Sequence, residues 1–161
     1  MELVGVKIQM PTNSPVLILR ETEGKRRLVP IFIGGPEAHA IDLAVSGTEV
    51  PRPMTHDLFI EVIEGLNATL NQVVIEELKD GTFYANLVMT DLQDNTILFS
   101  ARASDAVALA VRTSTPILAD ETVVDEAGII ESANNNKSGE EEMVEELREF
   151  LDKVSPEDFL P

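Results

Sequence analysis

The sequence contains no cysteine, which excludes disulfides, zinc sites built on thiolates and cysteine nucleophiles. A metal ion would therefore have to be held by oxygen atoms or by histidine. No apolar run approaches the roughly 20 residues that a membrane-spanning helix needs. The first ten residues lack the basic segment and apolar core of a secretory signal. We therefore expect a cytoplasmic chain that makes no contact with a membrane.

Lysine and arginine are also scarce. The 161 residues include 12 of them against 29 acidic residues, which gives a formal net charge of −17. Residues 1–130 carry 19 acids against 9 cations, and residues 131–161 carry 10 against 3. Affinity for nucleic acids comes largely from cations placed on phosphates, so this balance argues against tight nonspecific binding to DNA or RNA. A small local site remains compatible with it.

The length and the apolar content of 43% predict one globular domain with a sizeable core. We expect this domain at residues 1–130, followed by an acidic linker and a C-terminal amphipathic helix at residues 131–161. The apolar stripe of that helix consists of Met143, Leu147, Phe150, Leu151 and Val154. It would pack on its own domain or on a second copy, and binding of another partner is the alternative.

The domain repeats one pattern twice. Three β-type runs precede two helical segments, which follow Pro36 and Pro53, and the same order then recurs. A shift of 66 residues superimposes residues 40–45 on residues 106–111. We therefore predict an α+β fold, an internal duplication of a three-strand, two-helix unit with mostly antiparallel sheets. The strands are expected at residues 3–9, 16–20, 28–33, 72–78, 82–90 and 96–101.

The stretch ARASDAVALAVRT, residues 101–113, predicts a helix with a polar start. Ser104 is placed to cap it, and Asp105 complements the helix dipole in the first turn. Capping leaves Arg102 unexplained. Its guanidinium can hold a phosphate, or it can tie down a carboxylate across the duplication, such as that of Glu37.

Four ordered motifs resemble the bifunctional nuclease domain family. They are IGGPEAHAI at 33–41, RPMTHDL at 52–58, FYA at 83–85 and ARASDAVALA at 101–110. The resemblance covers about residues 1–130, and FLDKVSPEDF at 150–159 is similar to the tail of actinobacterial members. One departure is Ala103, where the family often has proline. The resemblance implies a duplicated α+β domain, commonly oligomeric, with members that degrade both DNA and RNA.

Metal-assisted phosphodiester hydrolysis needs carboxylates or histidines for Mg²⁺ or Mn²⁺, and cations that offset the phosphate charge. His39 and Asp42 are three residues apart and share a helix face, whereas Glu37 is two residues from His39 and does not. The 66-residue shift matches Asp105 with His39, so we expect these two side chains to face one another. We predict one site in which Glu37, His39, Asp42 and Asp105 bind the metal. His39, Asp105 and Arg102 are the predicted catalytic residues.

A second candidate site lies beside the predicted start of the helix after Pro53. Arg52 and His56 flank this start, where free amide groups favour an anion, so we predict a phosphate site there. For both sites the alternative stays open that the polar residues only cap helices and face solvent.

Two functional hypotheses follow. The first is a nuclease that hydrolyses DNA or RNA with Mg²⁺ or Mn²⁺ as cofactor. The second is a noncatalytic oligomeric regulatory or scaffold protein, in which the same polar residues form caps and interface bridges. Either hypothesis includes a homo-oligomer.

Overall fold

The structure, a computed structural model, describes residues 1–130. This part of the chain is an α+β fold, as predicted, and none of its helices is long and apolar enough to cross a membrane. The C-terminal helix predicted within residues 131–161 lies outside the described residues. In chain order the elements are β1 (Glu2–Gln9), β2 (Ser14–Arg20), β3 (Leu28–Phe32), α1 (Gly35–Ser46), α2 (Thr55–Gly65), β4 (Thr69–Lys79), β5 (Thr82–Thr90), β6 (Thr96–Arg102), α3 (Ala103–Thr113), β7 (Ile117–Ala119) and α4 (Glu121–Ala127).

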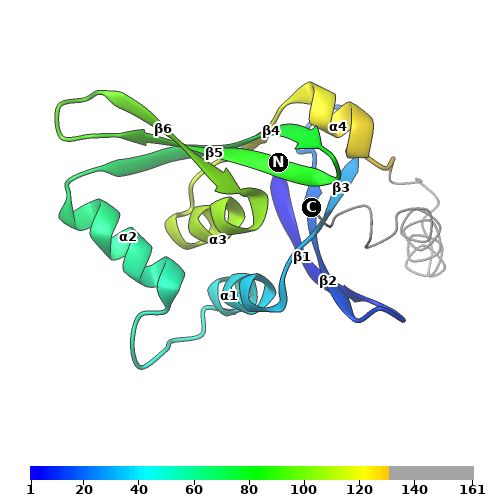
Figure 1. The fold of residues 1–161 in the computed structure, drawn as a ribbon, viewed down its shortest axis with the longest axis horizontal. Coiled ribbons are helices and arrows are strands. Elements are labelled where there is room, and N and C mark those ends of the chain that lie inside the picture. Colours follow the sequence, from blue (N-terminus) through cyan, green and yellow to red (C-terminus); the bar gives the residue numbers. More distant parts are fainter. Residues whose placement is uncertain (131–161) are drawn as a thin grey trace.

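The strands form two sheets (Figure 1). The first is an antiparallel meander in the order β1-β2-β3, and the second has the order β6-β5-β4-β7. The six predicted strands are confirmed, and so is the repeat of three antiparallel strands followed by a helix. β7, which pairs parallel to β4, was not predicted from the sequence. A strand of three residues is too short to show an alternating pattern.

Glycines fix two of the connections. Asp80 and Gly81 join β4 to β5 with φ angles of 49° and 72°, which is the backbone of a two-residue hairpin that asparagine, aspartate and glycine favour. Gly47 ends α1 in the left-handed conformation, with φ of 62°.

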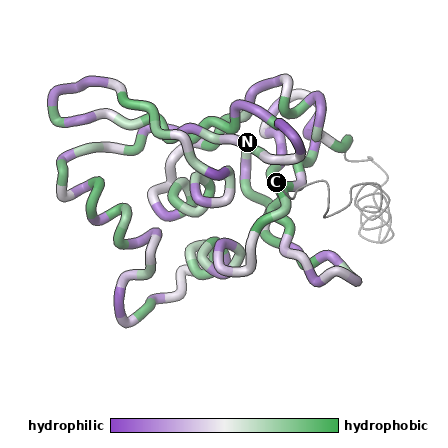
Figure 2. Tube along the Cα trace, in the orientation of Figure 1, coloured by the Kyte–Doolittle hydropathy of each residue, from purple (hydrophilic) through white to green (hydrophobic). Residues whose placement is uncertain are grey.

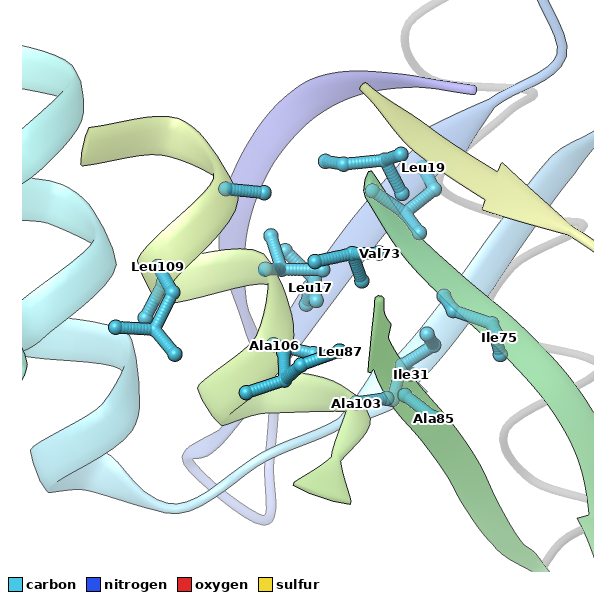
Figure 3. Close-up of a cluster of buried hydrophobic side chains, with 14 of the residues drawn as sticks. Leu17, Leu19, Ile31, Val73, Ile75, Ala85, Leu87, Ala103, Ala106 and Leu109 are labelled. Carbon is cyan, nitrogen blue, oxygen red and sulfur yellow. The ribbon is translucent and has the colours of Figure 1, made fainter. Parts of the chain in front are cut away.

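The central element is α3, which packs against the second sheet and against α1 (Figure 1). Figure 3 shows its residues Ala103, Ala106 and Leu109 gathered with side chains from both sheets. Small alanine side chains let the helix axis come close to the strands. One core therefore joins the two repeats. Its sheet residues in Figure 3 are Leu17, Leu19, Ile31, Val73, Ile75, Ala85 and Leu87.

The first turn of α3 differs from the expectation in one respect. The N-cap residue is Arg102, and Ser104 lies inside the helix, where it is buried. Ser104 as the cap was therefore a wrong prediction, whereas Asp105 does lie in the first turn. Because α3 starts two residues earlier than a Ser104 cap requires, Arg102 stands at the junction between β6 and the helix.

The end of the described chain is tied back to the first sheet. Leu28 of β3 and Ile129 form a bridge with backbone hydrogen bonds of 2.8 Å in both directions. Beside it the buried Arg27 donates two side-chain hydrogen bonds of 2.9 Å to Glu21 and one to Asp125 of α4. These bonds raise the pKa of Arg27 and lower that of Glu21. Backbone hydrogen bonds and ion pairs thus hold the end of the second repeat against the first repeat.

Candidate active site

Arg102 links the starts of α1 and α3. Its Nε donates to Asp105 Oδ2 at 2.7 Å, and its Nη2 donates to Asp105 Oδ1 at 3.0 Å. The same Nη2 donates to Glu37 Oε1 at 2.7 Å. The prediction that Arg102 can tie down Glu37 across the duplication is confirmed.

The backbone around Gly34 makes room for Glu37. Glu37 lies in the first turn of α1, and its side chain is only partly exposed. A Cβ atom on residue 34 would overlap Oε2 of Glu37. Glycine at this position therefore lets the carboxylate fold back over the helix start, with Oε1 directed at Arg102.

His56 joins the same group from the first turn of α2. Its Nε2 lies 3.2 Å from Oδ1 of Asp105. Within residues 1–130 its Nδ1 makes no hydrogen bond, and the imidazole side chain is 15% exposed. Asp105 thus pairs with His56, not with His39 as the 66-residue shift suggested. We call Glu37, His56, Arg102 and Asp105 the polar cluster.

The charges in the polar cluster are set by burial and hydrogen bonding. Burial acts to raise the pKa of Asp105, but the hydrogen bonds from Arg102 and His56 outweigh it, so the pKa is lowered overall. The hydrogen bonds to Asp105 and Glu37 raise the pKa of Arg102. At neutral pH the cluster therefore holds an ionised aspartate between a charged arginine and a histidine.

Arg102 also faces solvent. Its side chain is 65% exposed, and within the described residues Nη1 has no hydrogen-bond partner. Two N–H groups of a fixed, planar guanidinium are thus available to an anion. The geometry suits a phosphate group that approaches from solvent beside His56.

A second arginine positions the helix that carries His56. Arg112 of α3 donates from Nε to Asp57 Oδ1 at 2.6 Å and from Nη2 to the Ala40 carbonyl of α1 at 2.8 Å. The other oxygen of Asp57 accepts the Met54 N–H at 2.9 Å, at the start of α2. Arg112 therefore connects α3 to both α1 and α2, next to the residue that follows His56 in the chain.

This contact makes stability depend on pH. The hydrogen bond from Arg112 holds the pKa of Asp57 below its ordinary value of about 4, although burial opposes the shift. A carboxyl group whose pKa is lower in the folded state stabilises the protein at pH values above its pKa in the unfolded state. This contribution is lost as the pH falls through its pKa in the folded state. We expect Asp57→Asn to lower the free energy of unfolding at neutral pH and to matter less in acid. Urea denaturation of both proteins from neutral pH to below about pH 4 measures this. A constant difference at every pH would contradict it.

Three predicted site residues lie elsewhere on the surface. His39 and Asp42 are exposed on α1, and Arg52 is exposed in the loop before α2. Within residues 1–130 none of them makes a hydrogen bond or ion pair to the polar cluster. Their assigned roles, in metal binding, catalysis or phosphate binding, stay predictions.

The donor set of the polar cluster suits an arginine better than a metal ion. Arg102 occupies the space between Glu37 and Asp105, where a divalent cation would have to lie to be bound by both. Among the described residues no group of three histidines or acids is placed to hold a metal ion. As it stands, the cluster does not fit Mg²⁺ or Mn²⁺.

Comparison with known proteins agrees with the earlier resemblance. The family model of the bifunctional nuclease domain matches residues 17–132. An uncharacterised protein of Mycobacterium tuberculosis is 45% identical, over 98% of this chain and 95% of its own length. Bifunctional nuclease 2 of Oryza sativa subsp. japonica is 28% identical over 70% of this chain. This chain spans 35% of the rice protein.

The matched range contains the whole polar cluster, from Glu37 to Asp105, together with both repeats of the fold except β1 and the first three residues of β2. The chain belongs to the bifunctional nuclease domain family.

Proposed function

We propose that this chain hydrolyses phosphodiester bonds in DNA or RNA, and that the polar cluster is its active site. The observation that carries the proposal is the convergence of three helix starts, which puts a histidine–carboxylate pair beside an exposed arginine. Family membership and the similarity to the rice bifunctional nucleases support the reaction class.

The proposed reaction uses two side chains directly. His56 takes a proton on Nδ1 from a water molecule, whose oxygen forms a bond to phosphorus. The bond from phosphorus to the leaving oxygen breaks, and that oxygen takes up a proton from solvent. Asp105 orients the imidazole through Nε2 and stabilises its positive charge, as a carboxylate does in hydrolase triads. Arg102 donates to the nonbridging phosphate oxygens through Nη1.

The cofactor is a separate proposal. The roles of His56, Asp105 and Arg102 do not involve a metal ion, because the polar cluster does not offer three ligands to one. Binding of Mg²⁺ or Mn²⁺ by Glu37, His39, Asp42 and Asp105 would require Arg102 to leave its place between the carboxylates. Hydrolysis assays with either ion and with a chelator test this directly.

Arg102→Ala tests the proposed phosphate contact. We expect kcat/KM on single-stranded DNA and RNA to fall by about 10- to 100-fold, which corresponds to one hydrogen bond to a charged group. Arg26→Ala is the matched control, since Arg26 is also largely exposed but lies in the turn between β2 and β3. Circular dichroism of both variants checks that they are folded.

The second hypothesis, a noncatalytic scaffold, makes the opposite prediction. A chain in which Arg102 only bridges two carboxylates would show no hydrolysis above a nuclease-free blank, and Arg102→Ala would change stability alone. Equal activity of the wild type, Arg102→Ala and Arg26→Ala would mean a contaminating enzyme or another site. Either result would reject the polar cluster as the active site.

A further inference from the structure

β6 forms one edge of the second sheet. It pairs with β5 from Thr96 to Arg102 in continuous register, and among the described residues no strand pairs with its other side. Backbone N–H and C=O groups on that side are therefore free to bind another strand. We call this side the outer edge of β6.

The other sheet edges of the described chain carry features that discourage pairing. β1 has a bulge between Leu3 and Gly5, β3 contains Pro30, and β7 is only three residues long. By contrast, β6 has seven residues, and Thr96–Ala101 contains no charge, proline, glycine or bulge. A flat, uncharged edge strand is a template for pairing with another chain.

The side chains of β6 are unusually apolar for an exposed strand. Leu98 is 59% exposed and Phe99 is 48% exposed. Phe99 is paired with the buried Leu87 and shares its sheet face, whereas Leu98 faces the opposite side. Figure 2 shows the first half of β6 as hydrophobic, directly after the hydrophilic turn that joins it to β5. Both faces of the strand thus offer apolar surface next to the free backbone groups.

We propose that the outer edge of β6 pairs antiparallel with β6 of a second copy of this chain, around a twofold axis. The free backbone groups of β6 can be paired only by another strand. Residues 131–161 are a poor candidate for that strand, because their sequence has the apolar spacing of an acidic helix. Copies of a chain with net charge −17 repel one another, and this repulsion is weakest along an edge that carries no charge, as Thr96–Ala101 does. A twofold contact brings the same patch from each copy together, and this patch is self-compatible.

The pairing has a consequence for the polar clusters. Phe99 is the middle residue of β6 and Arg102 is the last, so pairing centred on Phe99 puts the two Arg102 residues about 20 Å apart along the strands. The clusters lie on opposite sides of the axis, and both stay open to solvent. This inference stands independently of the nuclease proposal, since it concerns assembly alone.

Leu98→Glu in the full chain tests the interface. We expect analytical ultracentrifugation to give twice the mass of one chain for the wild type and the mass of one chain for the variant. Ile8→Glu is the matched control: Ile8 is 54% exposed, lies on β1 in the other sheet, and receives the same charge. This control should keep the doubled mass.

Three results would overturn the proposal. They are a single-chain mass for the wild type throughout a concentration series, a doubled mass that survives Leu98→Glu, and dissociation by Ile8→Glu as well. Circular dichroism shows whether Leu98→Glu is folded.

Cysteine cross-linking gives a second test that does not need Leu98→Glu to fold. Because the chain has no cysteine, each single-cysteine variant from Ile97 to Ser100 reports one position. A residue next to the twofold axis meets its own copy at a distance that a disulfide can span. We expect at least one variant of this set to form a covalent dimer on mild oxidation, and Ile8→Cys to form none. Absence of a covalent dimer throughout the set would contradict strand pairing.

Discussion

Replacement of His56 by alanine is expected to lower the rate of phosphodiester hydrolysis by about 10²- to 10⁴-fold, the range that a general base contributes. The reason is geometric. His56 is the histidine whose Nε2 contacts Asp105, while its Nδ1 has no hydrogen-bond partner within residues 1–130. The loss should appear in kcat, because the imidazole acts on the attacking water and makes no contact with the ground-state phosphate. Initial rates on single-stranded DNA and RNA measure it.

The chain provides its own control for this experiment. It has two histidines, and His39 lies exposed on α1, outside the polar cluster. His39→Ala should lose far less activity than His56→Ala. A large loss in His39→Ala with full activity in His56→Ala would move the active site to the metal set predicted around His39. Asp105→Asn should resemble His56→Ala, because an amide cannot stabilise the positive charge on the imidazole.

Leu17→Ala is expected to lower the free energy of unfolding by about 2–5 kcal/mol. Leu17 is fully buried in β2, in the core that both sheets share with α3 (Figure 3). The variant loses the transfer free energy of three carbon atoms and leaves a cavity between elements of the two repeats. Urea denaturation followed by circular dichroism measures the difference.

Leu92→Ala removes the same atoms from the turn between β5 and β6, where Leu92 is mostly exposed. Its effect should stay within about 0.5 kcal/mol. If the two leucine variants were equally stable, the cavity argument would fail, and the core assigned to the two repeats would be wrong.

The fold could be predicted in large part because its signals are local. β-type runs in the sequence predicted the six longer strands. The short β7 escaped because its pairing with β4 is decided by tertiary contacts. The cap of α3 was predicted wrongly for a similar reason. Ser104 has a hydroxyl group that suits an N-cap, but it is buried inside the helix.

The candidate site was predicted only in part. The contact between Arg102 and Glu37 could be anticipated because the repeat puts α1 and α3 in equivalent places. The same equivalence pointed to His39 as the partner of Asp105, whereas the partner is His56. The position of α2 depends on Arg112, whose side chain crosses from α3 to Asp57.

The tie between Leu28 and Ile129, reinforced by Arg27 and Asp125, has a further consequence. Because of this contact, the last described segment packs on the first sheet, and α3 packs in a core that contains residues of both repeats. Neither half retains an intact hydrophobic interior without the other. We therefore expect the two repeats to unfold in a single cooperative transition.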